Sequence, residues 1–190
     1  PSLTPTRMRI ITGKWKGRQL QAPAGQGTRP TSDRLRETLF NVLADVDGAR
    51  VLDGFAGTGA IGLEALSRGA ARATFVERDS RVITVLNRNI SALDATNACV
   101  IIRDDFVRAA RRADLHAAFE LVIVDPPYDV ADLAAIATAA AGALAPGGQL
   151  VLEHSRRRDS PAAAGSASRT RVLVAGDSAL SFYTRPRDLP

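Results

Sequence analysis

Residues 51–66 read VLDGFAGTGAIGLEAL, an apolar run that passes through a glycine-rich turn into a helical pattern. Gly57, Gly59 and Gly62 have the spacing G-x-G-x-x-G. Such glycines let a backbone turn tightly, approach a ligand closely and pack the next helix against a sheet. The stretch therefore predicts the first strand-turn-helix unit of an α/β fold with a nucleotide-like ligand at the turn, and a purely structural glycine turn is the alternative.

The same alternation of short apolar runs and helical stretches continues along the chain. The predicted strands are RVLDGF, ATFVE, CVIIR, LVIVD and QLVLEH, and the predicted helices lie near 58–68, 80–93, 106–113 and 130–144. Continuously apolar strands between helices indicate a parallel sheet covered on both faces, which is a doubly wound α/β fold. The final runs in TRVLVAGDSALSFYTR, residues 170–185, predict an antiparallel hairpin at the sheet edge, for seven strands in all.

The two ends of the chain and one internal segment differ from this pattern. MRIITGKWKGRQLQAP, residues 8–23, suits a small hairpin, and RLRETLFNVLAD predicts a helix capped by Thr31 or Ser32. Leu35, Leu39, Phe40 and Leu43 line one face of that helix, and Arg34 and Arg36 point elsewhere. SRRRDSPAAAGSASR, residues 155–169, has little to bury and is expected to be a mobile loop. We expect an RNA-binding extension over residues 1–45 and a catalytic domain over 46–190.

The charge of the chain is unevenly distributed. Residues 1–40 hold eight Lys or Arg against two acids, residues 41–153 hold ten against fifteen, and residues 154–190 hold seven against three. The overall charge of +5 therefore comes from two basic ends around an acidic middle. This asymmetry favours a polyanion as partner of the ends, and a solvated basic surface is the alternative.

Composition also excludes several kinds of site. Cys99 is the only cysteine, and His116 and His154 have no metal-ligand spacing, so neither a disulfide nor a metal site is expected. The first ten residues lack the apolar core of a signal peptide, and no apolar run approaches the roughly 20 residues of a membrane span. We expect a cytoplasmic monomer.

Acidic residues close three successive predicted strands, at Asp53, Glu77 and Asp104. Glu77 lies 20 residues after Gly57, where an acid can bind both hydroxyls of a ribose. Asp53 can balance an ammonium group but would repel a pyrophosphate, so the three acids fit S-adenosylmethionine better than a dinucleotide. Asp104 is placed for the adenine amino group, and helix capping by Asp104 and Asp105 is the alternative.

DPPY, residues 125–128, closes the fourth predicted strand at the edge where open α/β sheets bind ligands. An exocyclic base amine is a poor nucleophile, and Asp125 with the Pro126 carbonyl can accept its hydrogens. Pro126 and Pro127 fix the backbone and remove donors, and Tyr128 can stack on a base turned out of its helix. The pattern predicts methyl transfer to an amine without a covalent enzyme intermediate, against the alternative of a structural Asp-Pro turn.

These motifs match a known family. VLDGFAGTGAIGLEALSRGA, FVERD, RDDF and DPPY resemble the class I methyltransferases, and MRIITGKWKGRQLQAP with RPTSDRLRETLFNVL is similar to the RsmD-type methyltransferases of bacterial small-subunit rRNA. The resemblance implies N2 methylation of a guanine in 16S rRNA, within the assembled small subunit. Carried over by position, it implies a cofactor site at Asp53, Gly54, Ala56, Gly57, Gly59, Glu77, Arg78, Asp104, Asp105 and Phe106. Asp105 stands where the family has a smaller residue.

The basic N-terminal segment supplies the candidate RNA contacts. These are Lys14, Trp15, Lys16, Arg18, Arg29, Arg34 and Arg36. Trp15 could stack on a base or cover an exposed hairpin edge. The alternatives to this function are transfer to another amine, in DNA, rRNA or a protein glutamine, an NAD-dependent oxidoreductase, and a noncatalytic RNA-binding module.

Overall fold

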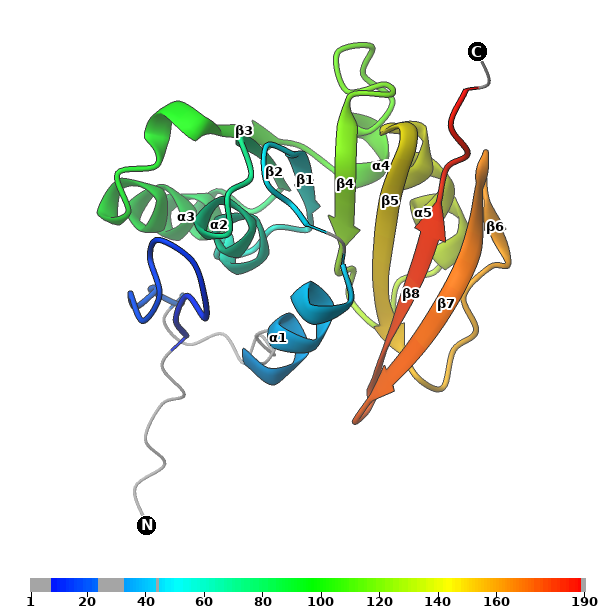
Figure 1. Cartoon of the computed structure of the whole chain (residues 1–190), viewed down its shortest axis with the longest axis horizontal. Helices are drawn as coiled ribbons and strands as arrows, with labels where there is room; N and C mark the ends of the chain where they lie inside the picture. The colour runs from blue at the N-terminus through cyan, green and yellow to red at the C-terminus, as the bar shows by residue number, and fades with distance from the viewer. Residues whose placement is uncertain (1–7, 24–32, 44, 189–190) are drawn as a thin grey trace.

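A single mixed sheet forms the centre of the protein in a computed structural model that describes residues 8–23, 33–43 and 45–188 (Figure 1). Its strands are β1 (Arg50–Gly54), β2 (Arg72–Glu77), β3 (Cys99–Arg103), β4 (Phe119–Val124), β5 (Leu144–Ser155), β6 (Ala163–Ala164), β7 (Ala167–Ala175) and β8 (Ser178–Thr184). The order across the sheet is β3-β2-β1-β4-β5-β8-β7-β6. β1 to β5 pair in parallel and β8, β7 and β6 add antiparallel strands, so the doubly wound α/β prediction is confirmed.

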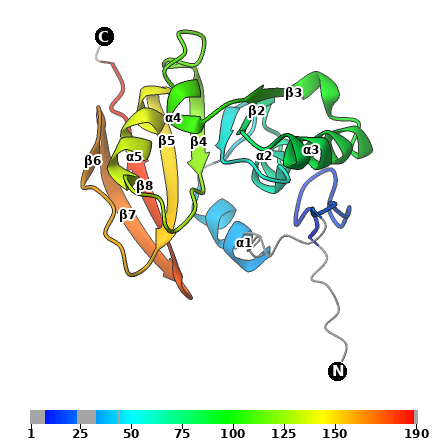
Figure 2. The same ribbon diagram turned by 180° about the vertical axis from the view of Figure 1, so that it is seen from behind.

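Helices cover both faces of the sheet. They are α1 (Asp33–Val42), α2 (Ala60–Ser67), α3 (Ser80–Ala92), α4 (Phe106–Ala109) and α5 (Leu133–Gly142), with a short 3₁₀ turn η1 (Thr96–Ala98). α1, α2 and α3 lie on one face and α4 and α5 on the other (Figures 1 and 2). Each face has its own apolar cluster, as the continuously apolar strands predicted. No helix of the described residues is long and apolar enough to cross a membrane.

Some element boundaries and the number of strands differ from the sequence prediction. α4 ends at Ala109 instead of near 113, and β5 begins at Leu144, five residues before the predicted start. The early part of β5 contains Gly147 and Gly148, which are poor strand formers, and its pairing with β4 shifts register at Phe119/Leu121. The described part of the sheet has eight strands instead of seven because the two-residue β6 pairs with β7.

The segment 155–169 is not the mobile loop that its composition predicted. Ala164 in β6 and Ala167 at the start of β7 are almost fully buried in the α5 face of the core. Ser160 is buried and shares a hydrogen bond with Ser181 of β8, 2.7 Å between the hydroxyl oxygens. Small side chains allow this close packing, and the polar ones find partners on β8, which a composition argument cannot detect.

The N-terminal segment folds as the predicted hairpin, with one antiparallel bridge between Arg9 and Gln19. Met8, Ile10 and Leu20 belong to the same core cluster as α1, α2 and the sheet, so this segment shares its core with the rest of the fold. The predicted apolar face of α1 is confirmed, since Leu35, Leu39, Phe40 and Leu43 are all buried. The cap predicted at Thr31 or Ser32 lies outside the described residues.

Candidate active site

A cleft of about 1520 Å³ opens at the carboxyl ends of the parallel strands. From β1 the chain runs outward through β2 to β3, and it then crosses back to place β4 on the other side of β1. The direction of strand addition therefore reverses at β1. Loops that follow adjacent strands diverge at such a point and leave room for a ligand. The segments after β1, β2, β3 and β4 all line the cleft, which brings together the acids predicted from strand ends.

The glycine turn between β1 and α2 lines the cleft, and Asp53 accepts a hydrogen bond from its third glycine. Gly59 has φ +81° and begins α2, and a Cβ at Gly62 would approach the Phe75 ring to 2.4 Å, so the predicted role of the third glycine in packing is confirmed. The carboxylate of Asp53 accepts the Gly62 N–H at 2.8 Å. Burial raises the pKa of Asp53, the Gly62 N–H opposes this, and the charges of Asp125 and Glu77 add to the rise, so that the pKa is about 8.

Glu77 ends β2 and ties the turn to the next loop. Its carboxylate accepts the Gly57 N–H at 3.0 Å, the Arg78 N–H at 2.8 Å and the Asp79 N–H at 2.9 Å. Each carboxylate oxygen can accept more than one hydrogen bond, so these contacts are compatible with ribose hydroxyls as further donors. Asp79 was not predicted as part of the site; it caps α3 and lines the cleft.

The segment after β3, residues 104–106, contributes an ion pair and an aromatic side chain to the cleft. A hydrogen bond from Arg108 lowers the pKa of Asp104, and Asp105 caps α4 by accepting the Arg108 N–H at 3.2 Å. Asp105 thus performs the capping role that the sequence left open as the alternative. Phe106 is buried beneath the cleft with its ring centroid 5.2 Å from that of Phe55, an aromatic residue that the sequence analysis missed.

The DPPY segment follows β4 and lines the cleft beside the end of β1. Pro126 is buried, Pro127 is exposed and the Tyr128 ring is half-buried. The Tyr128 hydroxyl shares a hydrogen bond of 2.5 Å with Ser178 Oγ of β8, so the ring is held at its polar end. The C-terminal hairpin, predicted only as a sheet edge, therefore supports the acceptor end of the site.

Glu153 of β5 is a further acidic residue of the cleft that the sequence analysis missed. It is 6% exposed, lines the cleft and lies next to the DPPY segment. The sequence signal was present, since QLVLEH ends a strand with an acid as β1, β2 and β4 do. Among the described residues, no three His, Cys, Asp or Glu side chains are grouped so as to hold a metal ion.

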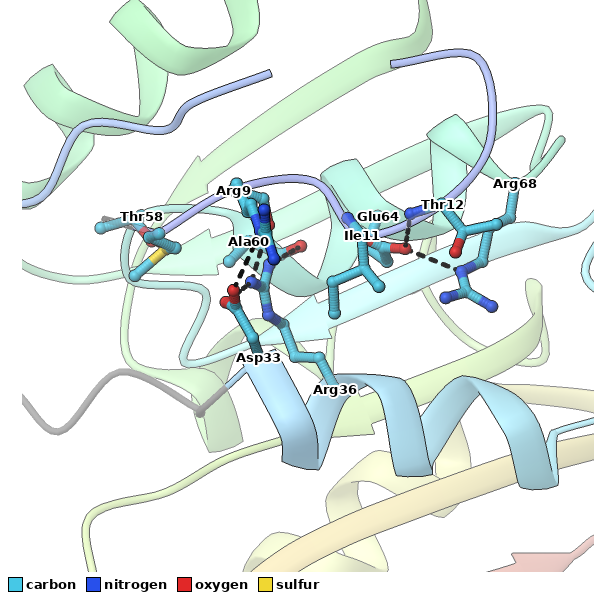
Figure 3. Close-up of polar contacts among 10 residues, drawn as sticks. Arg9, Ile11, Thr12, Asp33, Arg36, Thr58, Ala60, Glu64 and Arg68 are labelled. Carbon is cyan, nitrogen blue, oxygen red and sulfur yellow. Dashed lines mark hydrogen bonds and ion pairs between the residues drawn. The ribbon is translucent and has the colours of Figure 1, made fainter. Parts of the chain in front are cut away.

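Residues 8–23, here called the strap, run along α2 and return to the cleft. The Thr58 hydroxyl contacts Met8 Sδ at 3.2 Å near the start of α2, and Trp15 N donates to Ser67 Oγ at 3.0 Å at its end. Between them, the buried Glu64 carboxylate accepts the Ile11 and Thr12 N–H groups at 2.7 and 3.0 Å (Figure 3). The strap explains why every residue of α2 is buried.

Arg36 corrects one predicted RNA contact. Its side chain is 0% exposed and points from α1 to the strap and the start of α2, where it donates to the Arg9 carbonyl at 2.8 Å and pairs with Asp33 at 2.6 Å (Figure 3). It also donates to the Ala60 carbonyl at 3.4 Å. Helical spacing placed Arg36 off the apolar face of α1, but long-range carbonyl partners allow the guanidinium to be buried. Arg36 positions the strap and is inaccessible to RNA.

The remaining predicted RNA contacts lie in two places. Arg34 is exposed on α1 and lines the cleft, whereas Lys14, Lys16 and Arg18 are exposed at the tip of the strap. The length of α2 separates these places by about 12 Å. Trp15 is partly buried against the core with Lys14 Nζ 4.2 Å from its ring centre, which supports the covering role for this tryptophan. Arg29 lies outside the described residues.

Replacing Glu64 with alanine is expected to lower the free energy of unfolding by about 3 kcal/mol, because two backbone N–H groups and Arg68 lose a buried partner. Urea unfolding followed by the fluorescence of Trp15, the only tryptophan, would measure this and report on the strap itself. Glu37→Ala, on the exposed side of α1, is the matched control and should change stability by less than about 0.5 kcal/mol. An unchanged urea midpoint for Glu64→Ala would contradict the role of Glu64 in holding the strap.

The sequence of the chain is similar to those of known proteins over most of its length. The sequence profile of the family described as "Conserved hypothetical protein 95" matches residues 8–184. Bacillus subtilis YlbH is 38% identical over 187 residues, which cover 94% of this chain and 99% of that protein. "Ribosomal RNA small subunit methyltransferase D" of Escherichia coli K12 is 49% identical over 123 residues, 64% of this chain and 61% of that protein.

A solved structure shares the whole architecture. Escherichia coli yhhF superposes with a TM-score of 0.84 at 37% sequence identity, and the match covers 96% of this chain and 99% of the other. The similarity therefore includes the strap, the parallel sheet and most of the C-terminal strands.

Proposed function

The chain belongs to the conserved hypothetical protein 95 family, and we propose that it uses S-adenosylmethionine to methylate the exocyclic N2 amine of a guanine in 16S rRNA. The name of the Escherichia coli relative supports small-subunit rRNA as the substrate class. We further propose that the assembled small subunit is the preferred substrate, that the enzyme is a monomer acting in the cytoplasm, and that residues 1–45 bind RNA.

One observation carries the choice of cofactor. The N–H groups that a pyrophosphate would need are already bound by carboxylates, Gly57 to Glu77 and Gly62 to Asp53. A pyrophosphate would have to compete with both carboxyl groups for these donors and would be repelled by Glu77, which is unfavourable for NAD. A cofactor with an ammonium, a ribose and an adenine instead finds Asp53, Glu77 and the Asp104 loop along one wall of the cleft.

Different residues of the chain have different roles in the proposed reaction. S-adenosylmethionine supplies an electrophilic methyl group, which the amine attacks directly and in line. Asp53 and Glu77 orient the cofactor, and Tyr128 supports the flipped base by stacking. Asp125 and the Pro126 carbonyl accept hydrogens of the amine, and Asp125 takes the proton that the nitrogen loses after methylation.

Substrate analysis tests this proposal. Labelled S-adenosylmethionine would be incubated with small subunits lacking the modification and with naked 16S rRNA, and the nucleosides would be identified by mass spectrometry. N2-methylguanosine in the subunit sample is the expected product. Methyladenosine, methylated DNA or methylated glutamine in parallel reactions would reassign the acceptor and leave the fold and cofactor unchanged.

Replacing Lys14 and Lys16 with glutamine should weaken binding of the small subunit and flatten its salt dependence. The slope of log K against log salt should fall by about 0.7 to 0.9 for each phosphate that the variant no longer neutralises. Arg111→Gln, an exposed arginine after α4 on the opposite face of the sheet, is the control and should keep the wild-type slope. An unchanged slope for the double variant would show that RNA binds elsewhere.

Arg34 should behave differently from the tip of the strap because it lines the cleft. Arg34→Gln is expected to raise the KM for a short RNA hairpin and for the small subunit alike, by about fivefold to tenfold. The Lys14 and Lys16 variants should affect only the large substrate, since the tip lies at the far end of α2. If the Arg34 variant and the Lys14 and Lys16 variants raised the KM of both substrates equally, the proposed difference between the two positions would be contradicted.

A further inference from the structure

The pairing of β4 with β5 places Glu153 beside Asp125. Val124 of β4 is in register with Leu152 of β5, and the next residue on each strand is the acid. Asp125 and Glu153 are hydrogen-bonded to each other, and both line the cleft. Because the two strands are parallel, two carboxyl groups from distant parts of the sequence meet at the same point of the sheet edge.

Glu153 also contacts the groups that hold Tyr128. Its Oε1 accepts a hydrogen bond from Ser178 Oγ at 3.1 Å and one from the Tyr128 hydroxyl at 3.4 Å. Ser178 Oγ lies 2.5 Å from the Tyr128 hydroxyl, so the three groups form a closed polar cluster beneath the DPPY segment. One side chain thereby connects both residues that are proposed to contact the target base.

The cluster holds one proton between its two acids at neutral pH. Burial and, after it, the neighbouring charge of Asp125 together raise the pKa of Glu153 to about 8. Two adjacent buried carboxylates repel each other strongly, so a single shared proton is the favourable state. With Glu153 neutral, its O–H donates to Asp125, its carbonyl oxygen accepts from the Ser178 hydroxyl, and Ser178 Oγ accepts from the Tyr128 hydroxyl.

We propose that Glu153 is a positioning residue for methyl transfer, which holds Asp125 and Tyr128 against the acceptor base through a neutral carboxyl group. This inference rests on the proposed function. The Asp125 carboxylate takes the proton of the methylated amine and becomes neutral, and Glu153 keeps its own proton throughout. Asp125 then returns the received proton to solvent, so that charge and protons balance over a turnover.

The surroundings of Glu153 determine how this cluster responds to pH. Asp125 faces it from the end of β4, Tyr128 from the following loop and Ser178 from β8. Arg34 of α1 and Asp177 of the β7–β8 turn line the same cleft. As pH rises through about 8, Glu153 loses its proton, its donor to Asp125 disappears and a second negative charge is added, so kcat should fall.

The test compares Glu153→Ala and Glu153→Gln between pH 6.5 and 9.5. Glu153→Ala should lower kcat by about 30-fold to 100-fold, with the Kd for S-adenosylmethionine within twofold of wild type. The glutamine amide donates to Asp125 and accepts from Ser178 as a neutral carboxyl does, so Glu153→Gln should recover at least tenfold of that loss. It should also lack the alkaline decrease of kcat seen in the wild type.

A matched control and a second readout separate the possible failures. Glu120→Gln changes an acid at the other end of β4, paired with Arg50, and should keep the wild-type pH profile. Carbon-13 NMR of labelled Glu153 should show titration near pH 8 that moves to lower pH in Asp125→Asn, without any turnover. Glu153→Gln with the wild-type profile, or with the rate of Glu153→Ala, would overturn the inference. A wild-type enzyme that binds the cofactor but methylates no RNA would instead overturn the proposed function.

Discussion

Replacing Asp125 with alanine is expected to lower kcat for rRNA methylation by about a thousandfold, within the 10²–10⁴ range typical of a proton-accepting side chain. Asp125 follows β4 beside the end of β1, and its proposed role is to bind the acceptor amine, so the Kd for S-adenosylmethionine should stay within about twofold. Single-turnover rates and equilibrium binding of the cofactor would measure the two quantities separately. A loss confined to kcat would assign Asp125 to the amine and not to the cofactor.

Two further variants sharpen this prediction. Asp125→Asn keeps an acceptor oxygen but cannot take a proton, so its rate should lie between those of the wild type and Asp125→Ala. Asp129→Ala removes an exposed carboxylate from the same loop and should change kcat by less than about threefold. A wild-type rate in Asp125→Ala would remove this residue from the mechanism.

Replacing Glu77 with alanine should raise the Kd for S-adenosylmethionine by about a hundredfold. Two ribose hydroxyls would lose a charged acceptor, and each such hydrogen bond is worth about 1.5 kcal/mol. The turn would also loosen, because the N–H groups of Gly57, Arg78 and Asp79 lose their shared partner. At saturating cofactor, kcat should recover to within about threefold, since Glu77 does not contact the acceptor amine.

Isothermal titration and thermal unfolding together test the Glu77 assignment. Asp79→Ala is the matched control because it removes the neighbouring acid, which caps α3 and pairs with Arg81. That variant should melt at a lower temperature while its Kd changes by less than about threefold. A large change in Kd for Asp79→Ala, or none for Glu77→Ala, would move the ribose site away from Glu77.

The cleft acids were predictable because their positions depend on local sequence alone. In a parallel sheet every strand ends at the same edge, so an acid after an apolar run is placed there whatever the strand order. Asp53, Glu77, Asp104 and Asp125 all follow this rule and line one cleft. Glu153 follows it too, and the omission came from reading QLVLEH only as a core strand.

Other features depend on partners that are distant in sequence. Arg36 is buried because carbonyl groups of Arg9 and Ala60 accept its hydrogens, and no pattern within α1 reveals them. The segment 155–169 packs because β8 and α5 offer it partners and a surface. Helical spacing and segment composition both describe only residues that are near in sequence, so neither prediction could include the distant partners that bury these residues.

By itself, the sequence determined the α/β class, the glycine turn and the acidic strand ends, since each is specified by residues that are neighbours along the chain. The tertiary structure alone decided that β4 and β5 pair in register, that β8 inserts beside β5, and that the strap lies on α2. Those contacts join residues 23 to 55 positions apart, and their free energy comes from burial and long-range hydrogen bonds. The cluster of Glu153, Ser178 and Tyr128 exists only because such contacts form together.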